Sequence, residues 1–229
     1  MNNFLELKNI SKNFNTEKKI RVLNKLSYNF KKGKVYSLMG PSGSGKSTLL
    51  NLISLIDRPT NGSIKFDNTL VNFKENNKND IFRAKKIGIV YQQNNLLTDF
   101  TAFENLYLAS LSINDNKKMA MLKAKKLIKK IGLSNRSDHF PSQLSGGESQ
   151  RIAIARAIIN DPDIILADEP TGSLDIKTAM DIFDLLNNQK KPNRLIIFAT
   201  HNRFFAKKAD YLLELIDGSI KPTNARAFF

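Results

Sequence analysis

The 229-residue chain contains no cysteine and only two histidines. Without cysteine it can form no disulfide and can offer no thiolate to a metal, and two histidines disfavour a zinc site. The N-terminal stretch MNNFLELKNISKNF lacks the basic segment, the apolar run and the cleavage site of a signal peptide, and no apolar run approaches the roughly 18 residues of a membrane span. We therefore expect a soluble chain in a reducing cytoplasm.

Acidic residues are also scarce, because 21 Asp and Glu against 36 Lys and Arg leave a net charge of +15. Such an excess attracts nucleic acid or an anionic membrane surface, and charge alone does not choose between these partners.

Seven of the lysines lie in NKKMAMLKAKKLIKKIGL. The apolar residues of this segment predict one buried helical face; they are Met119, Leu122, Leu127, Ile128 and Ile131. We interpret the lysines as the solvated face of a surface helix, with contact to anionic lipid as the alternative. They are Lys117, Lys118, Lys123, Lys125, Lys126, Lys129 and Lys130.

Strand-like and helix-like segments alternate along the chain. The stretches NFLELKNI, NKLSYNFKKGKVYSLMG, DIILADEP, RLIIFATH and YLLELIDGSI have strand patterns, and KSTLLNLISLI has the spacing of a buried helix. After that helix, DRPTNG predicts a turn built from Pro59, Asn61 and Gly62. The segments from about Lys74 to Phe140 are short, polar and basic, which indicates a helical lobe. The alternation predicts an α/β core with a parallel sheet.

The stretch GPSGSGKST matches the phosphate-binding pattern G-x-x-x-x-G-K-[ST] and lies between a predicted strand and a predicted helix. Its glycines allow backbone N–H groups to surround phosphate oxygens, while Lys46 reaches the β and γ phosphates and Ser47 supplies a hydroxyl to Mg²⁺. We therefore predict that the chain binds a nucleoside triphosphate. The predicted binding residues of this loop are Gly40, Pro41, Ser42, Gly43, Ser44, Gly45, Lys46, Ser47 and Thr48.

Two acids end the apolar run IILADEP. Asp168 is placed to hold the Mg²⁺ shell, and Glu169 to accept a proton from an attacking water. An acid pair can also simply end a strand in a turn, but a phosphate loop in the same chain favours the catalytic interpretation.

The phosphate loop alone leaves open a kinase, a GTPase, a helicase or a transporter ATPase, and the stretch LSGGESQR decides among them. It resembles the signature loop of the ATP-binding cassette (ABC) ATPases, and the resemblance covers almost the whole chain. It implies one ABC domain over residues 1–229, with a RecA-like core, an N-terminal antiparallel β subdomain and an inserted helical subdomain at about residues 92–160. It also implies Mg²⁺-dependent ATP hydrolysis by an ATP-dependent homodimer.

The same resemblance assigns roles to further residues. In such a dimer Ser145, Gly146 and Gly147 close over the γ-phosphate held by the partner chain. Phe14 would stack on adenine, and Gln92 would sense Mg²⁺ and the transmembrane partner. The resemblance makes GSLD, residues 172–175, a loop that communicates across the dimer, and His201 a residue that touches the γ-phosphate and the attacking water. The implied catalytic residues are Lys46, Glu169 and His201, and the implied metal ligands are Ser47, Gln92 and Asp168.

Within the family, ADEPTGSLD and GIVYQQNNLLTDFTAFENL resemble the branch of lipoprotein-releasing, macrolide-exporting and cell-division cassettes. The lipoprotein-releasing ATPase is the most similar of these. The resemblance implies transmembrane permease subunits, a peripheral place on the cytoplasmic face of the inner membrane, and no direct contact with nucleic acid.

The alternative from another class is a soluble ABC ATPase that acts on ribosomes or DNA. Such proteins usually carry two cassettes or a long coiled-coil insertion, and this sequence has one cassette and no sustained heptad pattern. Three departures from the usual pattern, at Ser149, Ser173 and Asn202, remove no group assigned to the chemistry.

Overall fold

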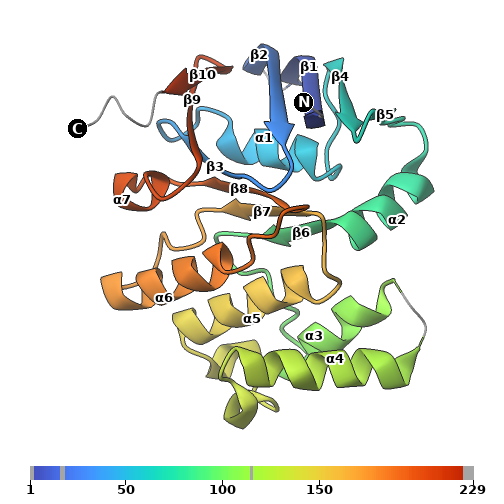
Figure 1. The fold of residues 1–229 in the computed structure, drawn as a ribbon, viewed down its shortest axis with the longest axis vertical. Coiled ribbons are helices and arrows are strands. Elements are labelled where there is room, and N and C mark those ends of the chain that lie inside the picture. Colours follow the sequence, from blue (N-terminus) through green and yellow to red (C-terminus); the bar gives the residue numbers. More distant parts are fainter. Residues whose placement is uncertain (1–2, 16–18, 114–115, 224–229) are drawn as a thin grey trace.

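The structure, a computed structural model, describes residues 3–15, 19–113 and 116–223. Its elements are stacked in layers (Figure 1): an antiparallel sheet, one helix, a mostly parallel sheet, and further helices on the opposite face of that sheet. Among the described residues, no helix has the length and apolar character needed to cross a bilayer.

The antiparallel sheet has the strand order β2-β1-β4-β5. Its strands are β1 (Asn3–Asn15), β2 (Lys19–Lys31), β4 (Asn61–Phe66) and β5 (Thr69–Leu70). Leu5 and Leu7 of β1 are buried whereas Lys8 is exposed, which is the alternation expected of a sheet that packs on one face.

The predicted turn around Gly62 is wrong at its end, because Asn61 and Gly62 begin β4. Gly62 has φ 98°, and a Cβ at this position would lie 2.5 Å from the carbonyl oxygen of Asn9. The glycine is needed because the backbone of β1 approaches closely at an irregular part of the β1–β4 pairing.

The second sheet has six strands in the order β10-β9-β3-β8-β7-β6. Neighbouring strands are parallel except for β10, which pairs antiparallel with β9. The strands are β3 (Val35–Met39), β6 (Ile87–Val90), β7 (Ile164–Asp168), β8 (Leu195–Ala199), β9 (Tyr211–Ile216) and β10 (Ser219–Thr223). All five residues of β8 are buried, so the apolar runs of the sequence are central strands covered on both faces. The predicted α/β core is confirmed.

Helices cover both faces of the parallel sheet. Helix α1 (Lys46–Ile53) packs between the two sheets through Leu49, Leu50, Leu52 and Ile53. On the other face, α5 (Gly146–Ile158), α6 (Ile176–Asn187) and α7 (Arg203–Ala206) bury a second core. Helix α2 (Asn76–Lys86) leads into β6. The two cores hold the parallel sheet between them and so fix the edge at which its strands end.

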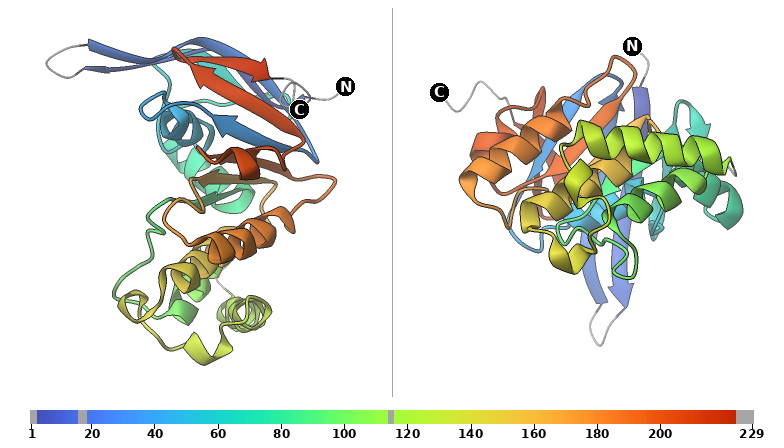
Figure 2. Two further views of the ribbon diagram at one scale, coloured as in Figure 1. Left: turned by 90° about the vertical axis from the view of Figure 1, so that its left-hand side faces the viewer. Right: turned by 90° about the horizontal axis from the view of Figure 1, so that it is seen from below.

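A third core joins α5 to α3 (Ala102–Leu111) and α4 (Lys117–Lys130). Two 3₁₀ turns, η1 (Ser134–Arg136) and η2 (Pro141–Gln143), connect α4 to α5. Figure 2 shows these helices at the end of the molecule opposite the antiparallel sheet.

The predicted apolar face of α4 is partly wrong. The buried stripe contains Ala120, Ala124 and Ile128, whereas Met119 is 46% exposed and Leu122 is 54% exposed. Helix α4 packs against α3, and alanines four residues apart permit close approach of the two backbones. The lysine side chains are on the exposed surface, as predicted.

Candidate active site

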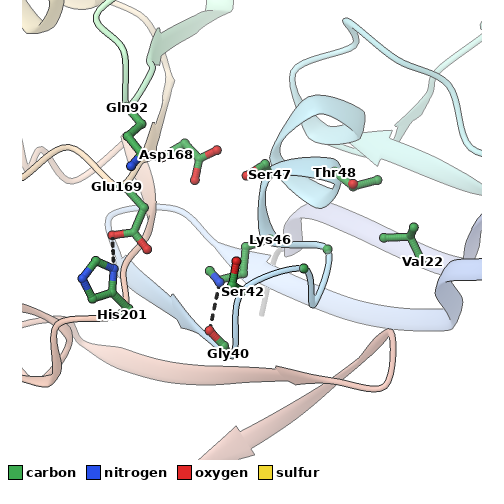
Figure 3. Close-up of a pocket in the computed structure, with 12 residues that line it drawn as sticks. Val22, Gly40, Ser42, Lys46, Ser47, Thr48, Gln92, Asp168, Glu169 and His201 are labelled. Carbon is green, nitrogen blue, oxygen red and sulfur yellow. Dashed lines mark hydrogen bonds and ion pairs between the residues drawn. The ribbon is translucent and has the colours of Figure 1, made fainter. Parts of the chain in front are cut away.

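The carboxyl ends of β3, β7 and β8 meet at one edge of the parallel sheet, where a cavity of about 420 Å³ lies (Figure 3). Residues from five separate segments form its wall. They are Val22, Gly40, Ser42, Gly43, Gly45, Lys46, Ser47, Thr48, Gln92, Asp168, Glu169 and His201. We call this the P-loop cavity.

The loop after β3 presents the start of α1 to the P-loop cavity. Gly45 is the N-cap of α1 with φ 99°, in the left-handed region that favours glycine. A Cβ on Gly45 would lie 2.8 Å from Cγ1 of Val22, so a larger residue would also meet β2. No side chain among the described residues caps this helix, which leaves its first N–H groups and its positive end available to an anion.

The ammonium group of Lys46 also lies at the P-loop cavity. Its Nζ donates hydrogen bonds to the carbonyl oxygens of Gly40, at 2.9 Å, and Pro41, at 3.0 Å. The hydroxyl oxygen of Ser44 is buried and has no hydrogen-bond partner among the described residues. The ammonium of Lys46 and the uncapped start of α1, both at the P-loop cavity, suit a phosphate group.

Asp168 and Glu169 reach the P-loop cavity from the end of β7. Glu169 has φ 45°, which is uncommon for a residue other than glycine and occurs disproportionately at functional sites. Its backbone N–H donates to the carbonyl oxygen of Ala199, at 3.0 Å, so the strained residue is anchored to β8.

His201 follows β8 and faces Glu169. Its Nδ1 lies 3.0 Å from Oε2 of Glu169, which is an ion-pair distance, but Oε2 accepts no well-directed hydrogen bond among the described residues. The side chain of Glu169 is 11% exposed and that of His201 is 69% exposed. The imidazole is thus open to solvent while the carboxylate is largely enclosed.

The residues predicted to hold a metal fit Mg²⁺ in their chemistry. Ser47, Gln92 and Asp168 all line the P-loop cavity, and they offer a hydroxyl, an amide oxygen and a carboxylate. Mg²⁺ prefers oxygen ligands of this kind.

Of the residues predicted to bind the chain's own nucleotide, three are not among the lining residues of the P-loop cavity: Phe14, Pro41 and Ser44. The Phe14 ring is 40% exposed, and Nζ of Lys12 lies 5.0 Å from its centroid. Val22, in contrast, lines the cavity and was missed by the sequence analysis. A valine in a strand carries no signal of its own, and only its contact with Gly45 reveals its position.

The predicted signature-loop residues lie at a different cavity, of about 490 Å³. It shares no lining residue with the P-loop cavity. We call it the signature cavity, and its lining residues are Leu133, Ser145, Gly146, Gly147, Glu148, Arg151, Ser173, Leu174, Asp175 and Thr178. The GSLD segment thus contributes three of its four residues here.

Helix α5 begins at the signature cavity with a capping box. The Ser145 hydroxyl accepts a hydrogen bond from the Glu148 N–H, at 3.2 Å, and a Glu148 carboxylate oxygen accepts one from the Ser145 N–H, at 2.8 Å. Gly147 packs against α6, because a Cβ there would lie 2.5 Å from Cγ2 of Thr178. The hydroxyl of Ser145 still has its own proton to donate.

A further cavity, of about 360 Å³, lies between α2, β6, α3 and the end of α5. Tyr91 and Arg156 are among its lining residues. The guanidinium of Arg156 donates to the carbonyl oxygens of Asn94, at 2.9 Å, and Asn95, at 2.6 Å, and burial lowers its pKa. Arg156 therefore fixes the loop that follows Gln92 on this side of the molecule.

The comparisons with known proteins all indicate the same protein family. The profile of the family described as ABC transporter matches residues 23–172. The lipoprotein-releasing system ATP-binding protein LolD of Rickettsia bellii is 43% identical over 221 residues, which cover 96% of this chain and 98% of that protein. The macrolide export ATP-binding/permease protein MacB of Mannheimia succiniciproducens is 37% identical over 95% of this chain, but the match covers only 34% of MacB.

Among solved structures, the ATP-binding cassette MJ0796 in a dimeric, post-hydrolysis state bound to ADP and Pi matches with a TM-score of 0.90 and 37% identity. The match covers 98% of this chain and 100% of that chain. The predicted cassette fold, with an antiparallel β subdomain beside a parallel core sheet, is confirmed.

Proposed function

Because the chain belongs to the ABC transporter family and is one of its ATP-binding, ATP-hydrolysing cassettes, we propose that it powers the release of lipoproteins from the inner membrane. The observation that carries this proposal is the 43% identity with a lipoprotein-releasing ATP-binding protein over nearly the full length of both chains. In this function, ATP-driven closure of the cassettes moves the membrane subunits. The cassette does not itself touch the lipoprotein.

The proposed roles in hydrolysis follow from the wall of the P-loop cavity. Lys46 and the N–H groups at the start of α1 bind and orient the β and γ phosphates. Ser47, Gln92 and Asp168 would hold Mg²⁺, which neutralises phosphate charge when it is bound. Glu169, held in place by β8, accepts a proton from the attacking water, and His201 donates a hydrogen bond toward the γ-phosphate.

We also propose that two copies assemble head to tail around ATP. Supporting this, the signature cavity is separate from the P-loop cavity of the same chain, so its N–H groups are available to another chain's nucleotide. A cavity of about 510 Å³ adjoins both and has exposed apolar side chains on its wall. These side chains are Ile176, Met180 and Phe204.

Light scattering on the Glu169→Gln variant tests this assembly, because that variant keeps ATP intact. The mass is expected to double with ATP and Mg²⁺ and to stay monomeric with ADP or without nucleotide. An equal mass under all three conditions would contradict the assembly.

The proposed membrane partner is a pair of transmembrane permease subunits. The 360 Å³ cavity beside Tyr91 offers a groove for a cytoplasmic helix of such a subunit, and Arg156 keeps the adjoining loop in place. Crosslinks from copurified membrane subunits are expected to cluster at residues 88–110. Crosslinks confined to β9 and β10 would refute the interface. The peripheral position on an inner membrane would follow from this partner and suits the net charge of +15.

Reconstitution tests the lipoprotein function. The complex of this chain with its membrane subunits is placed in proteoliposomes that hold an acylated lipoprotein. ATP is expected to move the lipoprotein into the soluble fraction, and a complex carrying Lys46→Ala is expected to release none. ATP-driven efflux of a macrolide without lipoprotein release would instead support an exporter, which the likeness to MacB makes the second candidate.

A further inference from the structure

The signature cavity carries more negative than positive charge on its lining side chains. The charged ones are Glu148, Asp175 and Arg151. Arg151 is already engaged, because its Nη2 lies 3.2 Å from Oδ2 of Asp181. Hydrogen bonds from Thr178 hold the pKa of Asp175 below its usual value, so this carboxyl is ionised at neutral pH. A polyphosphate that enters the cavity therefore meets two carboxylates.

Glu148 lies where a negative charge is most unfavourable for such a ligand. The hydrogen bond from the Ser145 N–H is the chief reason that the pKa of Glu148 lies below its usual value, so Glu148 is ionised as well. A carboxylate in the first turn of a helix offsets part of the positive helix end. That positive end is the group that the proposed function assigns to the partner's γ-phosphate.

Arg136 counters this charge from outside the cavity. Its Nε donates a hydrogen bond to Oε1 of Glu148, at 2.9 Å, and its Nη1 lies 3.2 Å from Nε2 of His139, which can accept a bond when the imidazole is neutral. The Arg136 side chain is 41% exposed and that of Glu148 is 22% exposed. A pair this open to solvent contributes little to folding stability, so its main effect is on the charge and direction of the carboxylate.

Resting on the head-to-tail assembly of the proposed function, we propose that Arg136 is a positioning residue for the nucleotide of the partner chain. It neutralises Glu148 and holds that carboxylate on the Ser145 N–H, so that the start of α5 receives the polyphosphate without repulsion. Arg136 acts through Glu148 and touches neither nucleotide nor metal.

The test measures the ATP concentration that gives half-maximal dimerisation of the full chain carrying Glu169→Gln. Arg136→Ala is expected to raise this concentration roughly fivefold, because a charge close to a polyphosphate is lost, and high salt is expected to shrink the effect. Arg136→Lys, which keeps the charge, is expected to change it less than about twofold. Lys129→Ala removes one positive charge from exposed α4 and serves as the matched control.

The decisive variant combines Arg136→Ala with Glu148→Gln. Glutamine keeps the capping bond to Ser145 without a charge, so the double variant is expected to return to within about twofold of the parent. If it stays as weak as Arg136→Ala alone, while thermal unfolding shows both to be folded, Arg136 merely braces the loop and the proposal is wrong. A parent that never dimerises with ATP would overturn the assembly and this role together. If the parent dimerises with ATP and Arg136→Ala leaves the half-maximal ATP concentration unchanged, only the role of Arg136 is overturned.

Discussion

The P-loop cavity and the signature cavity have similar volumes, about 420 Å³ and 490 Å³, but very different walls. The P-loop cavity combines an ammonium, two carboxylates and an imidazole at the ends of buried strands. The signature cavity also contains two carboxylates, but those of Glu148 and Asp175 are both engaged in helix-capping hydrogen bonds. This difference supports the proposal that the P-loop cavity performs the chemistry and the signature cavity closes the site.

The largest effect is expected when one acidic residue of each cavity is replaced by its amide. Glu169→Gln is expected to slow hydrolysis by roughly 10²–10⁴-fold with ATP binding retained, because the proton acceptor is lost. Glu148→Gln, its matched control in the signature cavity, is expected to keep turnover within about threefold. Single-turnover ATP hydrolysis measures both, and equal losses in the two variants would erase the proposed division between the cavities.

A second prediction tests whether the signature cavity closes over the partner's nucleotide. Gly147→Ala is expected to weaken ATP-driven dimerisation about tenfold, because the added methyl would overlap Cγ2 of Thr178 and displace the start of α5. Adding Thr178→Ser removes that methyl group and is expected to restore much of the loss. Thr178→Ser alone is the control, since it removes the same methyl group while Gly147 is kept. Sedimentation with increasing ATP gives the dimer fraction, and a Gly147→Ala variant that dimerises as well as Thr178→Ser alone would contradict the packing argument.

The smallest effect is expected at exposed lysines that line neither cavity. Lys123→Gln and Lys126→Gln lie on the exposed face of α4 and line neither cavity. Each is expected to change the free energy of unfolding by no more than about 0.5 kcal/mol and to leave ATP hydrolysis by the isolated chain unchanged. Urea denaturation and a steady-state assay measure these quantities, and a clear loss of hydrolysis would show that α4 influences a site.

Local patterns predicted the parts of the fold and site that depend on neighbours in sequence. The loop from Gly40 to Thr48 and the pair Asp168 and Glu169 could be found because each follows a strand whose end places it at one sheet edge. The central strands could be found because burial on both faces demands continuous apolar runs.

The remaining features depend on residues that meet only in three dimensions. The stripe of Ala120 and Ala124 was overlooked because close helix packing uses small residues, whereas an apolar pattern draws attention to large ones. Likewise, nothing local links Arg136 to Glu148, which lie on different elements 12 residues apart.

Mixing two defective chains tests directly whether the two cavities of one chain serve different nucleotides. Lys46→Ala disables the P-loop cavity, and Gly147→Asp brings a carboxylate and a steric clash to the signature cavity. Both chains also carry Glu169→Gln so that bound ATP persists, and ATP occlusion is measured in verified mixed dimers.

Each homodimer has no intact site, but the mixed dimer joins the intact P-loop cavity of the Gly147→Asp chain to the intact signature cavity of the Lys46→Ala chain. Up to one occluded ATP is expected in each mixed dimer, and essentially none in either homodimer. Occlusion in the mixed dimer that stays at the level of the homodimers would contradict the use of different nucleotides by the two cavities.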